Sequence, residues 1–128
     1  MIIRTGIDLV EIHRLADVDP RIRARFLQRV FTPGELRICG DSNEKLAGRF
    51  GVKEAVSKAL GTGIGPISWQ DVETLDGMMG EPILNLYGKA LRFAEVIGLE
   101  SWSVSISDSG DLVTAVAVAV GSGKKDFA

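Results

Sequence analysis

Glu54 and Lys58 are the residues whose types and spacing first suggest chemistry. They lie four residues apart in the stretch RFGVKEAVSKALGTG, which runs from residue 49 to residue 63. With about 100° of rotation per helical residue, both side chains fall on one face, where alanine and glycine neighbours leave room above them. The same order of charges also forms an ordinary exposed ion pair, worth about 0.3–0.5 kcal/mol. The spacing alone therefore leaves a binding site and a surface ion pair as alternatives.

Asp8 interrupts the stretch IIRTGIDLVEI, whose alternating apolar residues predict a strand over residues 2–12. A carboxylate is depleted in strands and costly to bury without a partner. One interpretation is a surface aspartate on a sheet with one solvated side. The other is that Asp8 and Glu54 converge, because two carboxylates and phosphate oxygens form the kind of site that Mg²⁺ prefers. Three basic residues would then supply positive charge for a polyphosphate: Arg49, Lys53 and Lys58.

A glycine-rich segment, GTGIG, follows the predicted helix at residues 61–65. Its glycines would let the backbone approach a ligand closely, but glycines also simply end helices. A Walker A loop is excluded, because its glycines precede a helix and end in Gly-Lys-Ser/Thr. His13 is the only histidine and is expected at the surface. With one histidine, expected at the surface, and one cysteine, the sequence excludes a Ser-His-Asp arrangement, a cluster of histidines around a metal and a cysteine-based zinc site.

The composition predicts one ordinary globular domain over residues 1–128, with 45% hydrophobic and 25% charged residues. Cys39 is the only cysteine, so no internal disulfide forms. The sequence shows no signal-type segment and no apolar run of the roughly 18 residues that a membrane span needs. These features predict a cytoplasmic protein that does not enter the membrane.

Positive charge is concentrated near the N-terminal end. Residues 1–60 hold 11 basic against 8 acidic residues, whereas residues 61–128 hold 4 against 9. A helix with a basic stripe beside an apolar one is predicted by arginines that recur every four residues, each followed by an apolar residue: Arg21, Arg25 and Arg29, with Ile22, Phe26 and Val30. The stripe predicts an acidic partner. A nucleic-acid-binding arm is the alternative, and the net charge of −2 argues against it.

The remaining periodicities predict an α+β fold, with a mostly antiparallel sheet packed against helices and one long central helix. That helix is expected from the capping residues at 41–43 to Leu60, stopped by Gly61. Another helix is expected at 87–98, strands at 68–75, 81–87, 101–107 and 111–120, a turn at 107–111, and a break at FTPGE, residues 31–35. The last strand has a face of small residues that fits either a helix or another subunit: Ala115, Ala117 and Ala119.

Three segments carry more information than periodicity: GIDLVEI at 6–12, FTPGEL at 31–36 and GRFGVKEAVSKALGTGIG at 48–65. Over essentially the whole chain they resemble the holo-acyl-carrier-protein synthases, the small-subunit class of phosphopantetheinyl transferases. The resemblance implies transfer of 4′-phosphopantetheine from coenzyme A to a serine of apo acyl carrier protein for fatty acid biosynthesis, releasing adenosine 3′,5′-bisphosphate. It also implies a requirement for Mg²⁺, with Mn²⁺ as a substitute, and a homotrimer with active sites at the subunit interfaces.

The resemblance further implies roles for single residues. Asp8 and Glu54 would hold the metal, and Lys58 would contact the phosphates. Glu54, directly or through a metal-bound water, would take the proton of the carrier's serine. The residues that would line the coenzyme A pocket are Arg49, Lys53, Ser57, Lys58, Gly61, Thr62, Gly63, Pro82, Ser107 and Asp108.

Asp108 departs from the family pattern, since many relatives carry a histidine here that contacts the 3′-phosphate of coenzyme A. That contact would instead come from Arg49 or from a neighbouring subunit. The region that docks the acidic carrier in relatives corresponds to Arg14, Arg21, Arg25, Phe26 and Arg29. A non-catalytic module that binds coenzyme A or a nucleotide and docks an acidic protein is the alternative function. Such a module would not need Asp8 and Glu54 together.

Overall fold

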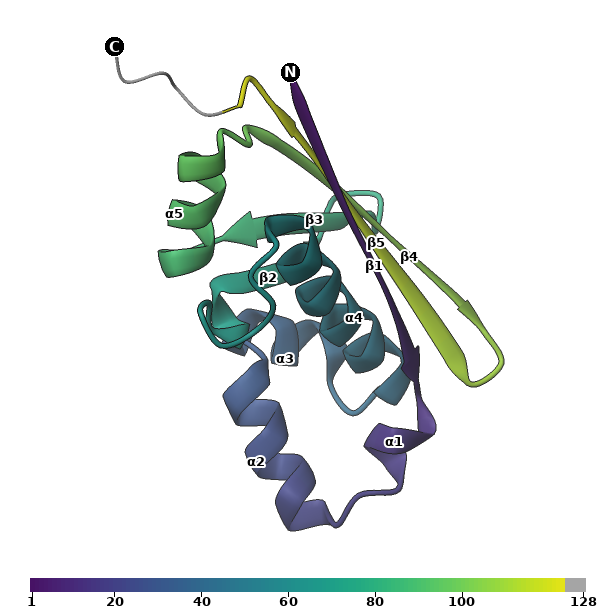
Figure 1. The fold of residues 1–128 in the computed structure, drawn as a ribbon. Coiled ribbons are helices and arrows are strands. Elements are labelled where there is room, and N and C mark those ends of the chain that lie inside the picture. Colours follow the sequence, from purple (N-terminus) through teal and green to yellow (C-terminus); the bar gives the residue numbers. More distant parts are fainter. Residues whose placement is uncertain (124–128) are drawn as a thin grey trace.

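The fold is built around one long helix, α4 (Asn43–Leu60), which lies between a three-stranded and a two-stranded sheet (Figure 1). The computed structural model describes residues 1–123. The other elements follow in the order β1 (Ile2–Glu11), α1 (His13–Ala16), α2 (Pro20–Val30), α3 (Pro33–Cys39), then after α4 a 3₁₀ turn η1 (Trp69–Asp71), β2 (Val72–Asp76), β3 (Pro82–Leu86), α5 (Gly88–Ile97), β4 (Ser101–Ser109) and β5 (Leu112–Gly121).

Both sheets are antiparallel, which confirms the predicted α+β class. The larger sheet has the order β1-β5-β4, so the first and last strands pair along their full length, with Asp8 opposite Ala115. The smaller sheet is the β2-β3 hairpin. The expected sheet is therefore divided into two pieces, and α4 contacts both of them.

Helix α4 begins and ends as its sequence predicts. The Ser42 hydroxyl accepts a hydrogen bond from the backbone N–H of Lys45 at 3.2 Å, and Gly61 closes the helix with φ of 78°, a left-handed conformation that favours glycine. The helix has no clean polar side because most of its circumference is covered, with Leu46, Val52 and Val56 completely buried.

Strand β1 approaches α4 unusually closely at Gly6. A Cβ atom at this position would lie 1.8 Å from the backbone oxygen of Ala55, so only glycine fits. Strand β5 turns its small residues toward the same helix, and a Cβ on Gly51 would lie 3.0 Å from the Cβ of Ala115. The alanine face of the last strand therefore packs against a helix of its own chain, which decides between the two alternatives.

The opposite face of the larger sheet is uncovered within residues 1–123 and is mainly apolar along β1 and β5, whereas β4 contributes exposed serines to it. On β1, Ile3, Ile7 and Leu9 are 57%, 58% and 65% exposed. The outward residues of the adjacent β5 are only partly buried: Thr114, Val116, Val118 and Val120.

Three local predictions are corrected by the structure. The FTPGE segment does not break the chain into a loop but starts α3, because Thr32 and Glu35 form a reciprocal capping box. The strand expected from residue 68 starts only at Val72, after the 3₁₀ turn η1. Strand β4 continues to Ser109, so Ser107 and Asp108 lie in a strand and not in the turn, which is formed by Gly110 and Asp111. The short helix α1 was also not expected.

None of the helices in residues 1–123 has an apolar stretch of the length needed to cross a membrane.

Candidate functional site

Asp8 lies on the helix-facing side of β1, two residues from the close approach at Gly6. Because Gly6 meets the backbone of α4 at Ala55, the following inward residue is brought beside the next turn of the helix. The Lys58 ammonium lies 3.2 Å from Asp8 Oδ1 and donates a hydrogen bond to the backbone oxygen of Ile7 at 2.9 Å. The Asp8 side chain is 17% exposed, which rules out the surface aspartate considered above. The structure thus brings the strand aspartate and the helix lysine together.

Glu54 completes this cluster as a half-buried carboxylate. Its pKa is raised by burial and by the negative charge of Asp8, while the positive charge of Lys58 opposes both effects. Among residues 1–123, no side chain or backbone N–H donates a hydrogen bond to the Glu54 carboxylate. Two carboxylates that repel one another, with one of them lacking a donor, fit a hard dication such as Mg²⁺.

The side chain of Lys53, the residue before Glu54, points into the core and not toward Asp8. Its side chain is completely buried, and its ammonium lies 2.8 Å from Glu35 Oε1 and donates hydrogen bonds to the backbone oxygens of Trp69, at 3.0 Å, and Val72. Burial lowers the pKa of Lys53, and the neighbouring carboxylate opposes that shift. The structure does not bring Lys53 to the surface beside Glu54.

Two buried glutamates on this side of α4 escaped the sequence reasoning. Glu35 also accepts hydrogen bonds from the backbone N–H groups of Thr32, at 3.0 Å, and Thr74, at 2.9 Å. Glu73 accepts hydrogen bonds from the hydroxyls of Thr32, at 2.5 Å, and Tyr87, at 2.9 Å. The pattern Thr-x-x-Glu at residues 32–35 is a helix-start pattern that could have revealed the first of them.

In the segment after α4, backbone N–H groups donate hydrogen bonds back to the last turn of the helix. The backbone N–H groups of Thr62 and Gly63 both donate to the backbone oxygen of Ser57, at 3.1 and 3.2 Å. The Ser57 hydroxyl is buried and donates to the backbone oxygen of Glu54 at 2.7 Å. Gly61 is exposed, and Thr62 and Gly63 are half-buried. In this structure Ser57 lies inside the helix packing, while the loop lies at the surface next to it.

A polar pocket of about 240 Å³ lies beside the first half of α4, where the helix meets β3 and β4. It is lined by Arg49, Pro82 and Asp108, and also by Ser105 in place of the expected Ser107. Arg49 forms an ion pair with Asp76, and its buried Nε has no hydrogen-bond partner among residues 1–123.

Acidic groups are frequent in this pocket. A hydrogen bond with Asp108, together with its negative charge, raises the pKa of Glu44. The pocket therefore combines one buried guanidinium with several carboxylates. A ligand phosphate here would depend on Arg49, on Lys45 or on a group from outside the chain.

An apolar groove of about 400 Å³ runs between β1, α1, α2 and α4. Phe26 lies in it and contacts the ring of Phe50, with ring centroids 5.8 Å apart. Arg14 also lines the groove and pairs with Glu11 at 3.1 Å. The remaining predicted docking residues are exposed along α2: Arg21, Arg25 and Arg29. The basic stripe and the apolar groove are thus neighbours.

Comparison with known proteins identifies the family. Residues 4–117 match the family model described as the 4′-phosphopantetheinyl transferase superfamily. A holo-[acyl-carrier-protein] synthase of Herpetosiphon aurantiacus is 41% identical over 124 residues, which cover 91% of this chain and 98% of the relative. Another, from Dehalococcoides mccartyi, is 44% identical over 115 residues, which cover 90% of this chain and 96% of the relative.

Solved structures agree with these relatives. The Helicobacter pylori holo-[acyl-carrier-protein] synthase in complex with coenzyme A matches with a TM-score of 0.82 and 33% identity, covering 91% of this chain and 99% of that one. The Bacillus anthracis synthase in complex with coenzyme A (3′,5′-ADP) matches with a TM-score of 0.73 and 30% identity, covering 95% and 96%. The chain therefore belongs to the 4′-phosphopantetheinyl transferase superfamily, in the family of the holo-[acyl-carrier-protein] synthases.

Proposed function

We propose that this protein transfers the 4′-phosphopantetheine group of coenzyme A to a serine of apo acyl carrier protein. The observation that carries the proposal is the convergence of Asp8, Glu54 and Lys58 where β1 meets α4. Membership of the family supports the substrates, because relatives are synthases of holo acyl carrier protein and two solved relatives hold coenzyme A. The supply of holo carrier for fatty acid biosynthesis is the expected role.

In the reaction, the serine oxygen forms a bond to the phosphorus that bears pantetheine. The bond from this phosphorus to the bridging oxygen breaks, and adenosine 3′,5′-bisphosphate leaves. Mg²⁺, or Mn²⁺ in its place, would be held by Asp8 and Glu54 and would stabilise negative charge on the phosphate oxygens. Lys58 adds a positive charge beside the same oxygens. The raised pKa of Glu54 suits a group that accepts the serine proton.

The nucleotide end of coenzyme A is proposed to occupy the polar pocket that contains Arg49, Pro82 and Asp108, with Ser107 on the same strand. Arg49 is its most buried cation and has an unpartnered Nε among residues 1–123. The phosphopantetheine arm would pass over the loop formed by Gly61, Thr62 and Gly63. Because Lys53 and Ser57 are buried, we propose that they support this surface from below and do not contact the ligand.

The acyl carrier protein is proposed to dock on α2 and the adjoining groove. An acidic helix of the carrier would pair with the exposed arginines, while an apolar side chain would enter the groove at Phe26. The groove gives this surface an apolar centre beside a charged rim, as expected of an interface that must be both specific and reversible.

A homotrimer is proposed as the active form. The uncovered apolar surface along β1 and β5 supports it, because monomeric proteins rarely leave a large contiguous apolar patch in water. The polar pocket would then lie near a neighbouring subunit, which could contribute a cation toward the 3′-phosphate. We expect the enzyme in the cytoplasm, and the buried free thiol of Cys39 is compatible with a reducing compartment.

The proposal is tested by incubating the protein with apo acyl carrier protein, coenzyme A and Mg²⁺, and then measuring the intact mass of the carrier. A gain of one phosphopantetheine group per carrier is expected, together with free adenosine 3′,5′-bisphosphate. A carrier that binds to the protein but keeps its apo mass with every divalent metal tested would favour the non-catalytic binding module instead.

A further inference from the structure

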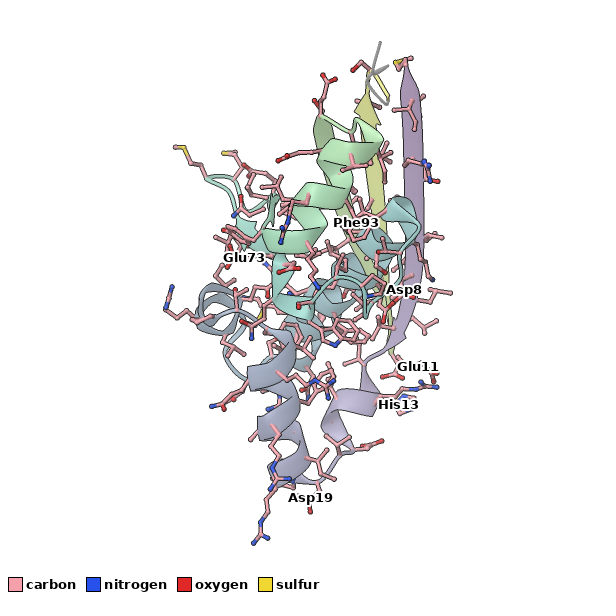
Figure 2. The ribbon with its side chains drawn as sticks, turned by 60° about the vertical axis from the view of Figure 1, so that its left-hand side comes forward. Asp8, Glu11, His13, Asp19, Glu73 and Phe93 are labelled. Atoms are coloured by element: carbon pink, nitrogen blue, oxygen red, sulfur yellow. The ribbon has the colours of Figure 1, made fainter. Side chains whose placement is uncertain are left out.

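A second group of side chains with metal-binding chemistry lies at the end of β1, apart from Asp8 and Glu54. Figure 2 shows two of its members, Glu11 and His13, where β1 passes into α1. The third, Asp111, lies in the turn between β4 and β5. One ligand atom from each residue lies within 4.8 Å of those from the other two. We propose that these three residues bind one Zn²⁺ ion, which clamps the β4–β5 turn to the β1–α1 junction.

Each carboxylate of this cluster is already held in place through one oxygen. Asp111 Oδ1 accepts a hydrogen bond from the backbone N–H of His13 at 2.9 Å. Glu11 Oε1 lies 3.1 Å from the Arg14 guanidinium. The second oxygen of each carboxylate faces the imidazole, since Asp111 Oδ2 contacts Nδ1 and Glu11 Oε2 lies 3.7 Å from Nε2. The two carboxylates therefore lie against opposite nitrogens of one ring, and a single ion, which takes only one of these nitrogens, requires one carboxylate to turn toward the other.

The donor types select the ion. One imidazole nitrogen and two carboxylate oxygens form a mixed set that Zn²⁺ accepts, with water completing the coordination. Mg²⁺ takes oxygen ligands and therefore does not favour this set. The site thus differs in chemistry from the pair of carboxylates at Asp8 and Glu54, and it would not compete for the same ion.

Small side-chain movements bring the donors to bonding distance. With metal–ligand distances of about 2.0–2.1 Å, the ligand atoms of a tetrahedral Zn²⁺ site lie roughly 3.3 Å apart. The side chains of His13, Glu11 and Asp111 are 48%, 44% and 51% exposed, so rotation of their outer bonds meets little resistance from packing. The imidazole uses one nitrogen for the ion, and its other nitrogen is left to water, because both carboxylates of the cluster are ligands of the ion.

The position of the cluster gives the ion a structural role. The backbone N–H of Ile12 already donates to the backbone oxygen of Asp111 at 2.8 Å, which ties the turn to the junction. A metal ion would add a second link across the same contact. Because it would bind the folded chain only, Zn²⁺ should raise the temperature of unfolding.

The test uses tag-free protein in which Asp8→Asn and Glu54→Gln remove the other carboxylate pair. Titration calorimetry with Zn²⁺ should give one ion per chain, and His13→Ala or Asp111→Asn added to this parent should weaken binding at least tenfold. Asp41→Asn, which changes an exposed aspartate outside the cluster, should leave binding unchanged. Zn²⁺ should raise the unfolding temperature of the parent but not of the His13→Ala protein.

Cobalt provides a spectroscopic check, because its visible absorption bands depend on the ligands and on their geometry. The parent should show Co²⁺ bands that shift or vanish with His13→Ala. Equal Zn²⁺ affinity with and without His13, or no Zn²⁺ binding to the parent, would overturn the proposal. Either result leaves the transferase proposal untouched, since that proposal rests on Asp8, Glu54 and Lys58.

Discussion

Glu54 and Glu73 show how the surroundings of a proposed functional carboxylate differ from those of a structural one. Burial and the neighbouring Asp8 both raise the pKa of this carboxylate, and only Lys58 opposes them. Glu73 is also buried, with 8% of its surface exposed, yet hydrogen bonds from Thr32, Tyr87 and Asn85 and the charge of Lys53 overcome the effect of burial and lower its pKa. A bound cation would stabilise the charge of Glu54, whereas hydrogen bonds within the fold already stabilise the charge of Glu73. Perturbed carboxylates of the first kind are typical of active sites.

The Glu54→Gln variant should be inactive but more stable than the parent when no metal is present. Since the pKa of Glu54 is higher in the folded than in the unfolded chain, ionisation of this carboxyl opposes folding at pH values above its unfolded pKa, which include neutral pH. Glutamine removes this cost. In chelator at neutral pH, the variant should unfold at a higher temperature, and Mg²⁺ should raise the unfolding temperature of the parent alone. A variant that is less stable in chelator and still responds to Mg²⁺ would argue against the metal assignment.

Glu73→Gln should have the opposite effect on stability. The pKa of Glu73 is lower in the folded chain, so its contribution is fully present above the unfolded pKa and is lost as pH falls through the folded pKa. The variant should lose about 1.5–3 kcal/mol of unfolding free energy at neutral pH, the usual value of hydrogen bonds to a charged group. Urea unfolding measured from neutral pH downward should show this difference shrinking in acid. A difference that stays constant with pH would show that the charge of Glu73 is not what stabilises the fold.

At the level of elements, the site depends on how tightly β1 and α4 pack. Gly6 lets the strand touch the helix backbone at Ala55, and this contact sets Asp8 beside Glu54 and Lys58. On the other side of α4, the buried pair of Lys53 and Glu35 joins the helix to α3 and to the start of β2. The helix that carries the site is therefore fixed from both sides.

Lys53→Met should destabilise the protein by about 3–5 kcal/mol, because it leaves the carboxylate of Glu35 buried without its cation. The matched control is Lys45→Met, which changes an exposed lysine of the same helix and should alter stability by no more than about 0.5 kcal/mol. Urea unfolding of both variants measures the difference. A small loss for Lys53→Met would mean that the pair is not a structural support, and it would return Lys53 to the candidates for coenzyme A binding.

Local sequence patterns predicted the elements that have strong end signals or clear periodicity. The bounds of α4 followed from Ser42 and Gly61, and the predicted α+β class is confirmed. Helix α3 was missed because Pro33 and Gly34 resemble a turn, although Thr32 and Glu35 reverse that preference by capping each other. Such a reciprocal contact depends on three-dimensional geometry as well as on residue type.

Side-chain direction was harder to predict than element type. Lys53 and Glu54 are adjacent and both charged, and nothing local indicates that one enters the core while the other faces Asp8. Their directions depend on partners distant in the sequence, such as Glu35, which lies on another helix. The same limit applies to the cluster around His13, whose Asp111 partner is 98 residues away.

For the whole molecule, the two faces of the larger sheet differ in what covers them. Its inner face of small residues packs on α4, and its outer face leaves Ile3, Ile7 and Leu9 in contact with solvent in the single chain. Figure 1 shows this sheet along one side of the chain, with the helices on the other. An assembly through the outer face would leave the exposed arginines of α2 free for a carrier protein, and it would adjoin the apolar groove at Leu9, which borders both surfaces.

Ile7→Glu should therefore yield a monomer in sedimentation analysis at concentrations where the parent is a trimer, because a charge would be buried in the subunit contact. Leu91→Glu is the control, since Leu91 is an exposed apolar residue on α5 and not on this sheet. It should leave the trimer intact. If Ile7→Glu assembles as the parent does, the outer sheet face is not the subunit interface.

The intact mass of an acyl carrier protein after reaction tests the central claim, that Asp8 and Glu54 act together in the transfer. Parallel reactions with coenzyme A and Mg²⁺ would use the parent, Asp8→Asn, Glu54→Gln and the exposed control Asp41→Asn. The parent and the control should convert the carrier to its phosphopantetheine form, while each site variant should be slower by a factor of at least about 100. Conversion by Asp8→Asn or Glu54→Gln at the rate of the parent would contradict the account.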